Sequence, residues 1–217
     1  MANVFKTKPL PHGSLQLDGD LVIPSQAQGL VVFAHCSGSG RQSPRDQWVA
    51  RALQRSQMAT LQIDLLTEDE SRDGRRLFDI DLLAHRMIET IRWTSLHPDL
   101  TDLRLGLFGA SASAGAALVA AAARPDRVAA VVSRGGRPNL VMDHLEQVQA
   151  PTLLIVGGLD DEVLALNREA MRRLHVPRRL EVIPGAGHRF EEPGALGSVA
   201  IFASSWFSQY LCAARPT

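Results

Sequence analysis

The chain has 217 residues, of which 45% are hydrophobic and 21% are charged. This composition is that of a globular protein and excludes a disordered, collagen-like or coiled-coil chain. Lys and Arg together number 23, as do Asp and Glu, so the formal charge is zero and we expect no binding of nucleic acid or acidic membranes.

The length fits one domain, since single cores grow to roughly 250 residues before chains divide. Two cysteines, Cys36 and Cys212, are too few for the disulfide framework of a small secreted protein, so free thiols are expected. The opening segment lacks the apolar stretch of a signal peptide, and no run of about 18 apolar residues occurs. We therefore predict a cytoplasmic protein with a single domain over residues 1–217, in which 1–13 form an extended arm or a first strand.

Short apolar runs alternate with longer amphipathic ones along the rest of the chain. A hairpin is predicted from residues 14–17 and 21–23. Buried strands follow at 30–34, 60–63, 103–108, 128–133, 152–156 and 180–183. Helical spacing of apolar residues is found at 48–53, 80–91, 163–174 and 196–211. The segment 114–123 is small and apolar all round, which predicts a buried helix. This alternation predicts an α/β fold, a mostly parallel sheet of about seven to eight strands with helices on both faces.

The segment from Ser133 to Pro151 has room only for a loop and one short helix. That is too little for a separate lid over the carboxyl edge of the sheet. An open, shallow site without a lid domain is therefore expected.

A candidate nucleophile lies in the sequence GASAS at 109–113, directly after the predicted strand at 103–108. Strand, sharp turn and helix form an elbow that holds a serine, here Ser111, at a strained backbone position. Residues two before and two after this serine must be small, because strand and helix nearly touch there. The amide of Ala112, at the helix N-terminus, is placed to stabilise an oxyanion.

A second register of the same elbow makes Ser113 the nucleophile, with Gly115 as the small residue after it. We favour Ser111, because the nucleophile should follow the strand end at Phe108 by about three residues, whereas Ser113 would already lie in the helix. A tight turn without chemistry is the third interpretation.

A candidate acid follows the predicted strand at 152–156, in the sequence GGLDDE at 157–162. Asp160 is placed to leave the sheet edge and face a histidine. The spacing favours it over Asp161. The alternative is that all the acids of this segment begin the next helix and interact with its dipole.

A candidate base, His188, lies in the glycine-rich loop after the strand at 180–183. The order Ser111, Asp160, His188 is the chain order of one known type of catalytic triad. We therefore predict Ser111 as nucleophile, His188 as base and Asp160 as the acid that orients it.

The strand at 30–34 runs into HCSGSGR at 35–41, a loop whose amides can curl over the nucleophile. The amide of Ser37 is the candidate for the second oxyanion donor. His35 is expected to brace this loop by hydrogen bonding, and both His35 and Cys36 are candidates to contact substrate.

Arginines are predicted at the same sheet edge: Arg41, Arg45, Arg134 and Arg137. They are candidates to bind an anionic substrate, Arg41 and Arg134 above all. The alternative is that they are solvated loop charges that pair with the acids at 68–70.

With these segments placed, the sequence resembles the α/β-hydrolase superfamily and, within it, the small dienelactone-hydrolase-like proteins that have no lid. The resemblance covers about residues 28–211. It rests on AHCSGSGR at 34–41, LGLFGASAS at 105–113, LLIVGGLDD at 153–161 and PGAGHRFEEPG at 184–194. It implies the α/β-hydrolase fold, a triad on the three residues named above, no metal and no organic cofactor.

Two positions depart from this resemblance. The dienelactone hydrolases proper have a cysteine nucleophile where Ser111 stands, so lactone opening is not carried over as the reaction. Cys36 stands in the oxyanion loop where relatives usually have glycine, and its side chain is expected to narrow the site or alter the loop.

The predicted function is hydrolysis of a small carboxylic ester, thioester or lactone through an acyl-enzyme. The predicted partner is a small acyl substrate, anionic if the arginines bind it. A catalytically silent relative that binds a partner is one alternative. Another is a nucleotide-binding protein that uses the glycine-rich loop after the first parallel strand. That loop has Ser43 where a dinucleotide fingerprint has its third glycine, and it lacks the lysine of a P-loop.

Overall fold

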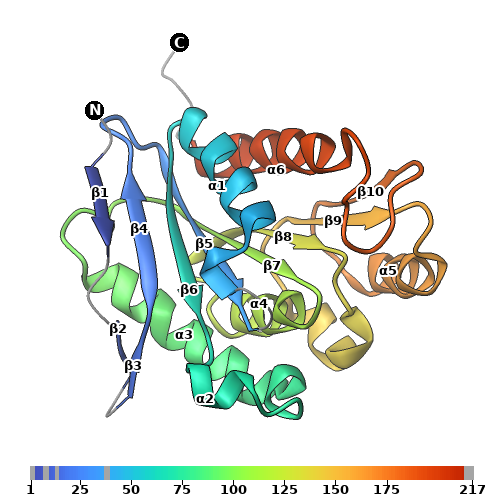
Figure 1. The fold of residues 1–217 in the computed structure, drawn as a ribbon, viewed down its shortest axis with the longest axis horizontal. Coiled ribbons are helices and arrows are strands. Elements are labelled where there is room, and N and C mark those ends of the chain that lie inside the picture. Colours follow the sequence, from blue (N-terminus) through green and yellow to red (C-terminus); the bar gives the residue numbers. More distant parts are fainter. Residues whose placement is uncertain (1–2, 7–9, 13–14, 37–39, 213–217) are drawn as a thin grey trace.

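The computed structural model describes residues 3–6, 10–12, 15–36 and 40–212. An eight-stranded sheet runs through this part of the chain (Figure 1). In their order across the sheet, its strands are β1 (Asn3–Lys6), β4 (Gly19–Ile23), β6 (Met58–Asp64), β5 (Gly29–His35), β7 (Leu105–Ala110), β8 (Val128–Arg134), β9 (Thr152–Gly157) and β10 (Arg178–Ile183). The pairs β1–β4 and β4–β6 are antiparallel, and the other pairs are parallel.

Helices cover both faces of this sheet. They are α1 (Pro44–Arg55), α2 (Glu68–Ser71), α3 (Ile80–Leu96), α4 (Ala112–Ala123), α5 (Asp161–Arg173) and α6 (Ala195–Leu211). Figure 1 shows α1 and α6 over one face, and α3, α4 and α5 over the other. The prediction of a mostly parallel sheet between two helical layers is confirmed.

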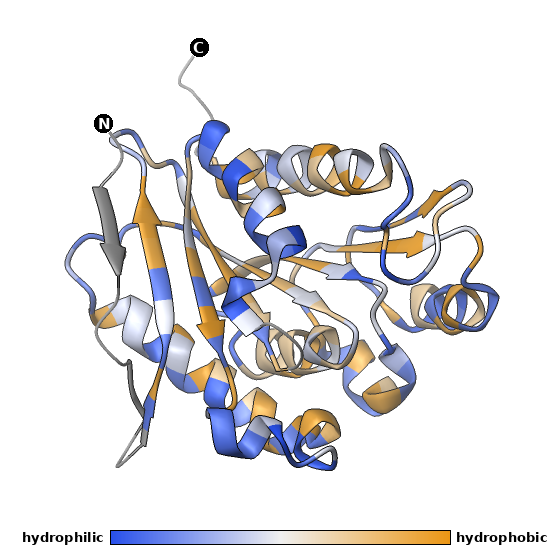
Figure 2. Ribbon diagram, viewed as in Figure 1, coloured by the Kyte–Doolittle hydropathy of each residue, from blue (hydrophilic) through white to orange (hydrophobic). Residues whose placement is uncertain are grey.

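The central strands are hydrophobic on both sides because each side meets a helical layer. Every residue of β5 is buried. Val31 and Phe33 pack in the cluster under α1 and α6, while Leu30 and Val32 pack in the cluster against α3 and α4. Figure 2 shows the apolar colouring of these inner strands. Each buried side chain of this size stabilises the fold by about 1.5–3 kcal/mol.

Small side chains let α4 lie close to the sheet. Nine of its residues are buried, most of them alanine. It follows β7 after a single intervening residue, so its N-terminus lies at the carboxyl edge of the sheet.

The predicted hairpin near the start of the chain is wrong in its pairing. Residues 15–17 form β3, which pairs with β2 (Leu10–His12) in a separate two-stranded sheet. The second predicted strand, β4, instead pairs with β1 and β6 inside the main sheet. Both predicted strands are present, but they do not pair with each other.

Between β8 and β9, the structure has two 3-10 helices, at Pro138–Leu140 and Met142–Gln147. This stretch therefore adds no lid over the neighbouring strand ends. No helix in the described ranges has the length and apolar character needed to cross a membrane.

Candidate active site

Ser111 joins β7 to α4 in a strained backbone conformation. Its φ is 52° and its ψ is −123°, a backbone conformation that residues other than glycine rarely adopt. A conformation of this kind costs of order 1–3 kcal/mol and persists where the surrounding structure holds it. The Ser111 amide donates to the carbonyl oxygen of Arg134 at 3.2 Å, and the Ser111 carbonyl accepts from the amide of Arg137 at 3.4 Å. The elbow is therefore fixed from β8 as well as from its own helix.

Ser113, the alternative nucleophile, is 2% exposed and lies inside α4. Its hydroxyl lies 2.9 Å from the carbonyl oxygen of Ala34 and 2.8 Å from that of Ala110, and it accepts the Ala110 amide at 3.1 Å. These bonds tie β5, β7 and α4 together. The side chain of Ser113 thus has a structural role, whereas Ser111 makes no capping bond with its own side chain.

His188 and Asp160 form a pair across two loops. The Nδ1 atom of His188 lies 2.7 Å from Oδ2 of Asp160. With the carboxylate ionised, Nδ1–H donates and Nε2 is left to accept a proton. Asp160 is the N-cap residue of α5 but makes no capping bond, and Asp161 is the first residue of the helix. The sequence-predicted acid, and not its neighbour, therefore contacts the predicted base.

Ser111 and His188 line the same cavity, whose volume is about 370 Å³. It lies at the carboxyl ends of β5, β7 and β8, beside the loop after β10. Its other lining residues include His35, Cys36, Arg134 and Arg189. The ends of four predicted strands thus contribute to one site.

Of the two predicted oxyanion donors, the structure describes Ala112 but not Ser37. Ala112 is the first residue of α4, and the first four amides of a helix have no acceptor within the helix. The positive end of the helix dipole therefore lies beside Ser111. Ser37, the other predicted donor, lies outside the described residues.

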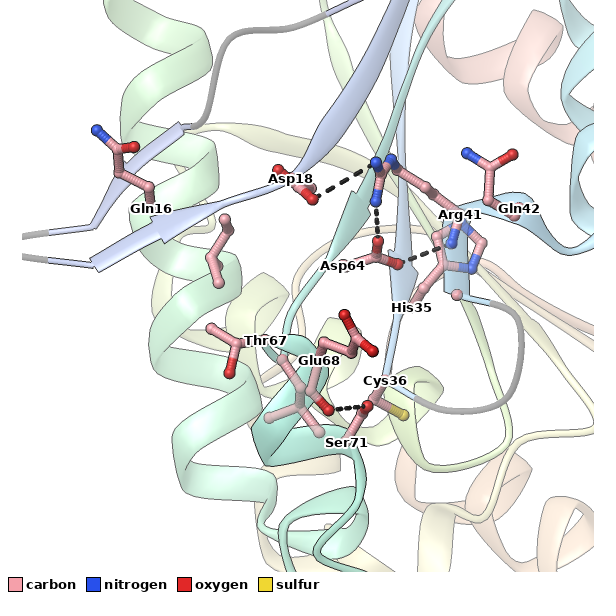
Figure 3. Close-up of a pocket in the computed structure, with 13 residues that line it drawn as sticks. Gln16, Asp18, His35, Cys36, Arg41, Gln42, Asp64, Thr67, Glu68 and Ser71 are labelled. Carbon is pink, nitrogen blue, oxygen red and sulfur yellow. Dashed lines mark hydrogen bonds and ion pairs between the residues drawn. The ribbon is translucent and has the colours of Figure 1, made fainter.

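Arg41 faces a different cavity, of about 450 Å³, which neither Ser111 nor His188 lines (Figure 3). Its guanidinium pairs with Asp64, Asp20 and Asp18, and its amide donates to Asp64 at 2.7 Å. The structure therefore does not bring Arg41 to the cavity of the predicted nucleophile.

Arg134 does line that cavity, but it is not a solvated loop charge. It ends β8, is 8% exposed, and its Nη1 lies 2.7 Å from Oδ1 of Asp46. Its guanidinium carbon is 5.9 Å from the ring centre of Phe108 and 6.0 Å from that of Phe190. A buried ion pair with aromatic contacts replaces the expected exposed charge.

The expected pairing of these arginines with the acids at 68–70 is also wrong. Arg45 pairs with Glu191, and Arg137 pairs with Glu162. The acids at 68–70 bind arginines near them in space, which are Arg72, Arg76 and Arg86.

His35 ends β5 in a buried position, and it lines both cavities together with Cys36. Burial lowers the pKa of the His35 imidazole, against the opposing effect of the Asp46 carboxylate, whose Oδ2 lies 3.5 Å from Nδ1. The ring is therefore neutral near pH 7. The carbonyl oxygen of His35 accepts the amide of Leu65 at 2.7 Å, which joins the start of the loop to the end of β6.

Two residues of the cavity were missed in the sequence. Asp46 lies in the first turn of α1, where an acid is ordinary, so no local signal marks it. Arg189 follows His188 directly and lines the cavity, and no carboxylate in the described part of the chain forms an ion pair with it. Its position next to the predicted base was the available signal.

Comparisons with known proteins identify the family and the fold of this chain. The model of the dienelactone hydrolase family matches residues 69–209. A crystal structure of a dienelactone hydrolase from Anabaena variabilis is 51% identical, covers 97% of this chain and 99% of its own, and has a TM-score of 0.93. Est1E from Butyrivibrio proteoclasticus has a TM-score of 0.77 at 14% identity, covering 93% of this chain and 97% of its own, which shows a shared fold.

A putative phosphoribosyl transferase of Mycobacterium tuberculosis is 50% identical over 205 residues, which is 94% of this chain but 46% of that protein. The chain thus spans less than half the length of this curated relative, and the relative's name describes the longer protein. The family model and the nearly complete overlap with the Anabaena structure show that this chain has the α/β-hydrolase fold and belongs to the dienelactone hydrolase family.

Proposed function

We propose that the protein is a serine hydrolase that cleaves a small carboxylic ester, thioester or lactone through an acyl-enzyme. The observation that carries the proposal is one cavity lined by Ser111 and by His188, whose imidazole is paired with Asp160. Family membership supports a hydrolase, while the serine chemistry rests on these three residues.

In the proposed reaction, Oγ of Ser111 attacks the acyl carbon while Nε2 of His188 takes its proton. The resulting oxyanion receives a hydrogen bond from the amide of Ala112. His188 then returns the proton to the leaving group, and the acyl group remains on Ser111. Water then attacks the acyl carbon while His188 takes its proton, and His188 gives that proton to Oγ of Ser111 as the carboxylic acid leaves.

Asp160 acts through the imidazole. Its bond to Nδ1 holds the tautomer in which Nε2 is the acceptor, and its charge stabilises the imidazolium that forms during each proton transfer. The amide of Ser37 remains our proposal for the second oxyanion donor, from its position after β5.

We propose further that the substrate carries an anionic group that contacts Arg189. The arginines that line the cavity are Arg45, Arg134 and Arg189. The first two already pair with carboxylates, which leaves Arg189 as the cation with no acidic partner in the described ranges. Arg189 replaces Arg41 and Arg134, which the sequence favoured, as the candidate for that contact.

A fluorophosphonate probe tests the nucleophile, because it reacts with a serine that an adjacent base activates. The wild type and Ser113→Ala are expected to be labelled at residue 111, as read by peptide mass spectrometry. Ser111→Ala should not be labelled. Labelling at Ser113 in the wild type would overturn the register, and an unlabelled wild type would favour the catalytically silent alternative.

A pair of p-nitrophenyl esters tests the anionic group, one with a terminal carboxylate on the acyl chain and one neutral ester of equal length. Arg189→Gln should raise KM for the carboxylate ester about 10-fold or more, with little effect on the neutral one. Arg92→Gln, an exposed arginine on α3, is the matched control. Equal KM changes for the two esters in Arg189→Gln would reject the contact.

A further inference from the structure

We propose that Arg134, held by Asp46, is a positioning residue that sets the elbow of Ser111 and the loop of His188 against each other. The inference rests on the proposed function, because it concerns the geometry of the proton transfer between these two residues. It gives Arg134 a role other than the substrate binding that its charge suggested.

The side chain of Arg134 bridges the two segments. Its guanidinium carbon lies 5.9 Å from the ring centre of Phe108 and 6.0 Å from that of Phe190. Phe108 stands three residues before Ser111 on β7, and Phe190 stands two residues after His188. A cation over an aromatic face is attracted by the ring quadrupole, and more strongly where water is excluded. One buried cation thus contacts a ring from each half of the proposed catalytic pair.

The main chain of Arg134 also holds the elbow. Its carbonyl oxygen accepts the Ser111 amide at 3.2 Å, and Arg134 pairs with Ala110 in the sheet. The nucleophile is therefore attached to Arg134 through the backbone, while the base loop meets it through Phe190. A shift of the guanidinium would therefore displace Phe190 and the base loop, while the backbone bond between Arg134 and Ser111 stays in place.

The base loop depends on that contact. Phe190 is 1% exposed and has a φ of 55°, which is unusual for an aromatic residue. A strained, buried residue of this kind stays in place only where its surroundings hold it. Arg134 is part of those surroundings, and His188, two residues earlier, is 44% exposed in its side chain and has little packing of its own.

Asp46 fixes the guanidinium. Its side chain is 9% exposed and that of Arg134 is 10% exposed, so both charges are largely removed from water. A buried ion pair of this kind often stabilises a fold no better than apolar residues would, but removing one partner leaves an uncompensated charge. Asp46 also faces Nδ1 of the neutral His35 at 3.5 Å, so Arg134 is the cation that balances it.

The test uses variants that separate charge from shape. Arg134→Met together with Asp46→Asn removes both charges and leaves none unpaired. Arg134→Lys keeps the positive charge but not the planar guanidinium. The control is Arg124→Met with Asp126→Asn, which removes an arginine–aspartate pair remote from this cavity. Thermal unfolding selects the variants that fold, and Arg134→Gln with Asp46→Asn replaces the Met/Asn pair if that double variant does not fold.

We expect the Met/Asn double variant to react with a small fluorophosphonate at least 10-fold more slowly than the wild type, and Arg134→Lys to recover most of that loss. The control should react at the wild-type rate. With the two p-nitrophenyl esters, kcat should fall by a similar factor for both while each KM stays within about twofold.

A wild-type labelling rate in a folded double variant that lacks both charges would overturn the inference. So would a rise in KM confined to the carboxylate ester, since that result would make Arg134 a substrate-binding residue. Failure of the proposed function looks different, because the wild type itself would then not react with the probe.

Discussion

The backbone of Gly109, near the end of β7, nearly touches that of Ala114 in α4. A Cβ atom built on Gly109 would lie 2.5 Å from Cα and 2.7 Å from the amide nitrogen of Ala114. Real Cβ atoms do not approach backbone so closely, and neither segment can yield without moving the other. This contact sets the angle at which the chain turns through Ser111.

Gly109→Ala should therefore lower the free energy of unfolding by about 2–3 kcal/mol, because it overpacks a contact between two backbones. Fluorophosphonate labelling should slow as well, since the elbow must open. Urea denaturation and labelling rates measure both effects. Gly74→Ala is the matched control, because a Cβ there would meet no atom within 4 Å. Equal stability of the two variants would show that the elbow can relax around a methyl group.

The φ of 52° at Ser111 predicts that the conformation of this residue lowers the stability of the fold. Glycine adopts such a conformation without a Cβ clash, although it loses more entropy on folding. Ser111→Gly should therefore be more stable than Ser111→Ala by about 1 kcal/mol, as measured in urea. If alanine were the more stable of the two, the backbone at 111 would not be strained in solution.

Asp160→Asn should lower kcat by about 10³- to 10⁴-fold, because an amide can donate to Nδ1 and favour the wrong imidazole tautomer. Asp161→Asn is the control, since Asp161 is exposed at the start of α5. Its effect should stay within about threefold. The assignment fails if Asp161→Asn is the more damaging change in a p-nitrophenyl ester assay.

Glu70 gives a prediction for acid stability. Hydrogen bonds from Arg86, at 2.6 and 2.8 Å, lower the pKa of Glu70 from 4.5 to about 2, helped by the backbone amide of Thr67. A carboxyl with a depressed pKa in the folded state stabilises the protein above its unfolded pKa, and this stability is lost as pH falls from 4.5 toward 2. In Glu70→Gln, the free energy of unfolding should therefore decrease less than in the wild type as the pH is lowered from about 5 to about 3.

The control for this measurement is Glu146→Gln. Glu146 is exposed and forms no ion pair with the rest of the described chain. Urea midpoints at several pH values should separate the two variants. A slope for Glu70→Gln equal to that of the wild type would mean that the Arg86 contact does not persist in solution.

The sequence alone was sufficient to predict those residues of the candidate site that directly follow the end of a strand. A run such as 152–156 is apolar because both faces of its strand are covered, and the residue that leaves the sheet after it must be at the carboxyl edge. Asp160 and His188 could be paired on that ground alone. The small residues around Ser111 could be recognised because the close approach of strand and helix demands them.

Contacts between distant segments could not be read in this way. Arg134 and Asp46 are 88 residues apart, and each alone looks like an ordinary loop or helix-start charge. The pairing of β4 was not predicted for the same reason. Its apolar pattern indicates a strand but does not indicate which strand lies beside it. Partner choice depends on the assembled sheet, and no local preference encodes it.

Ala110 lines the cavity next to Ser111 as the last residue of β7. The turn at Ser111 is a property of the backbone, whereas the side chain at 110 contributes to the shape of the cavity beside it. A substitution at 110 therefore changes the shape of this cavity by one side chain, while the backbone turn at Ser111 stays in place.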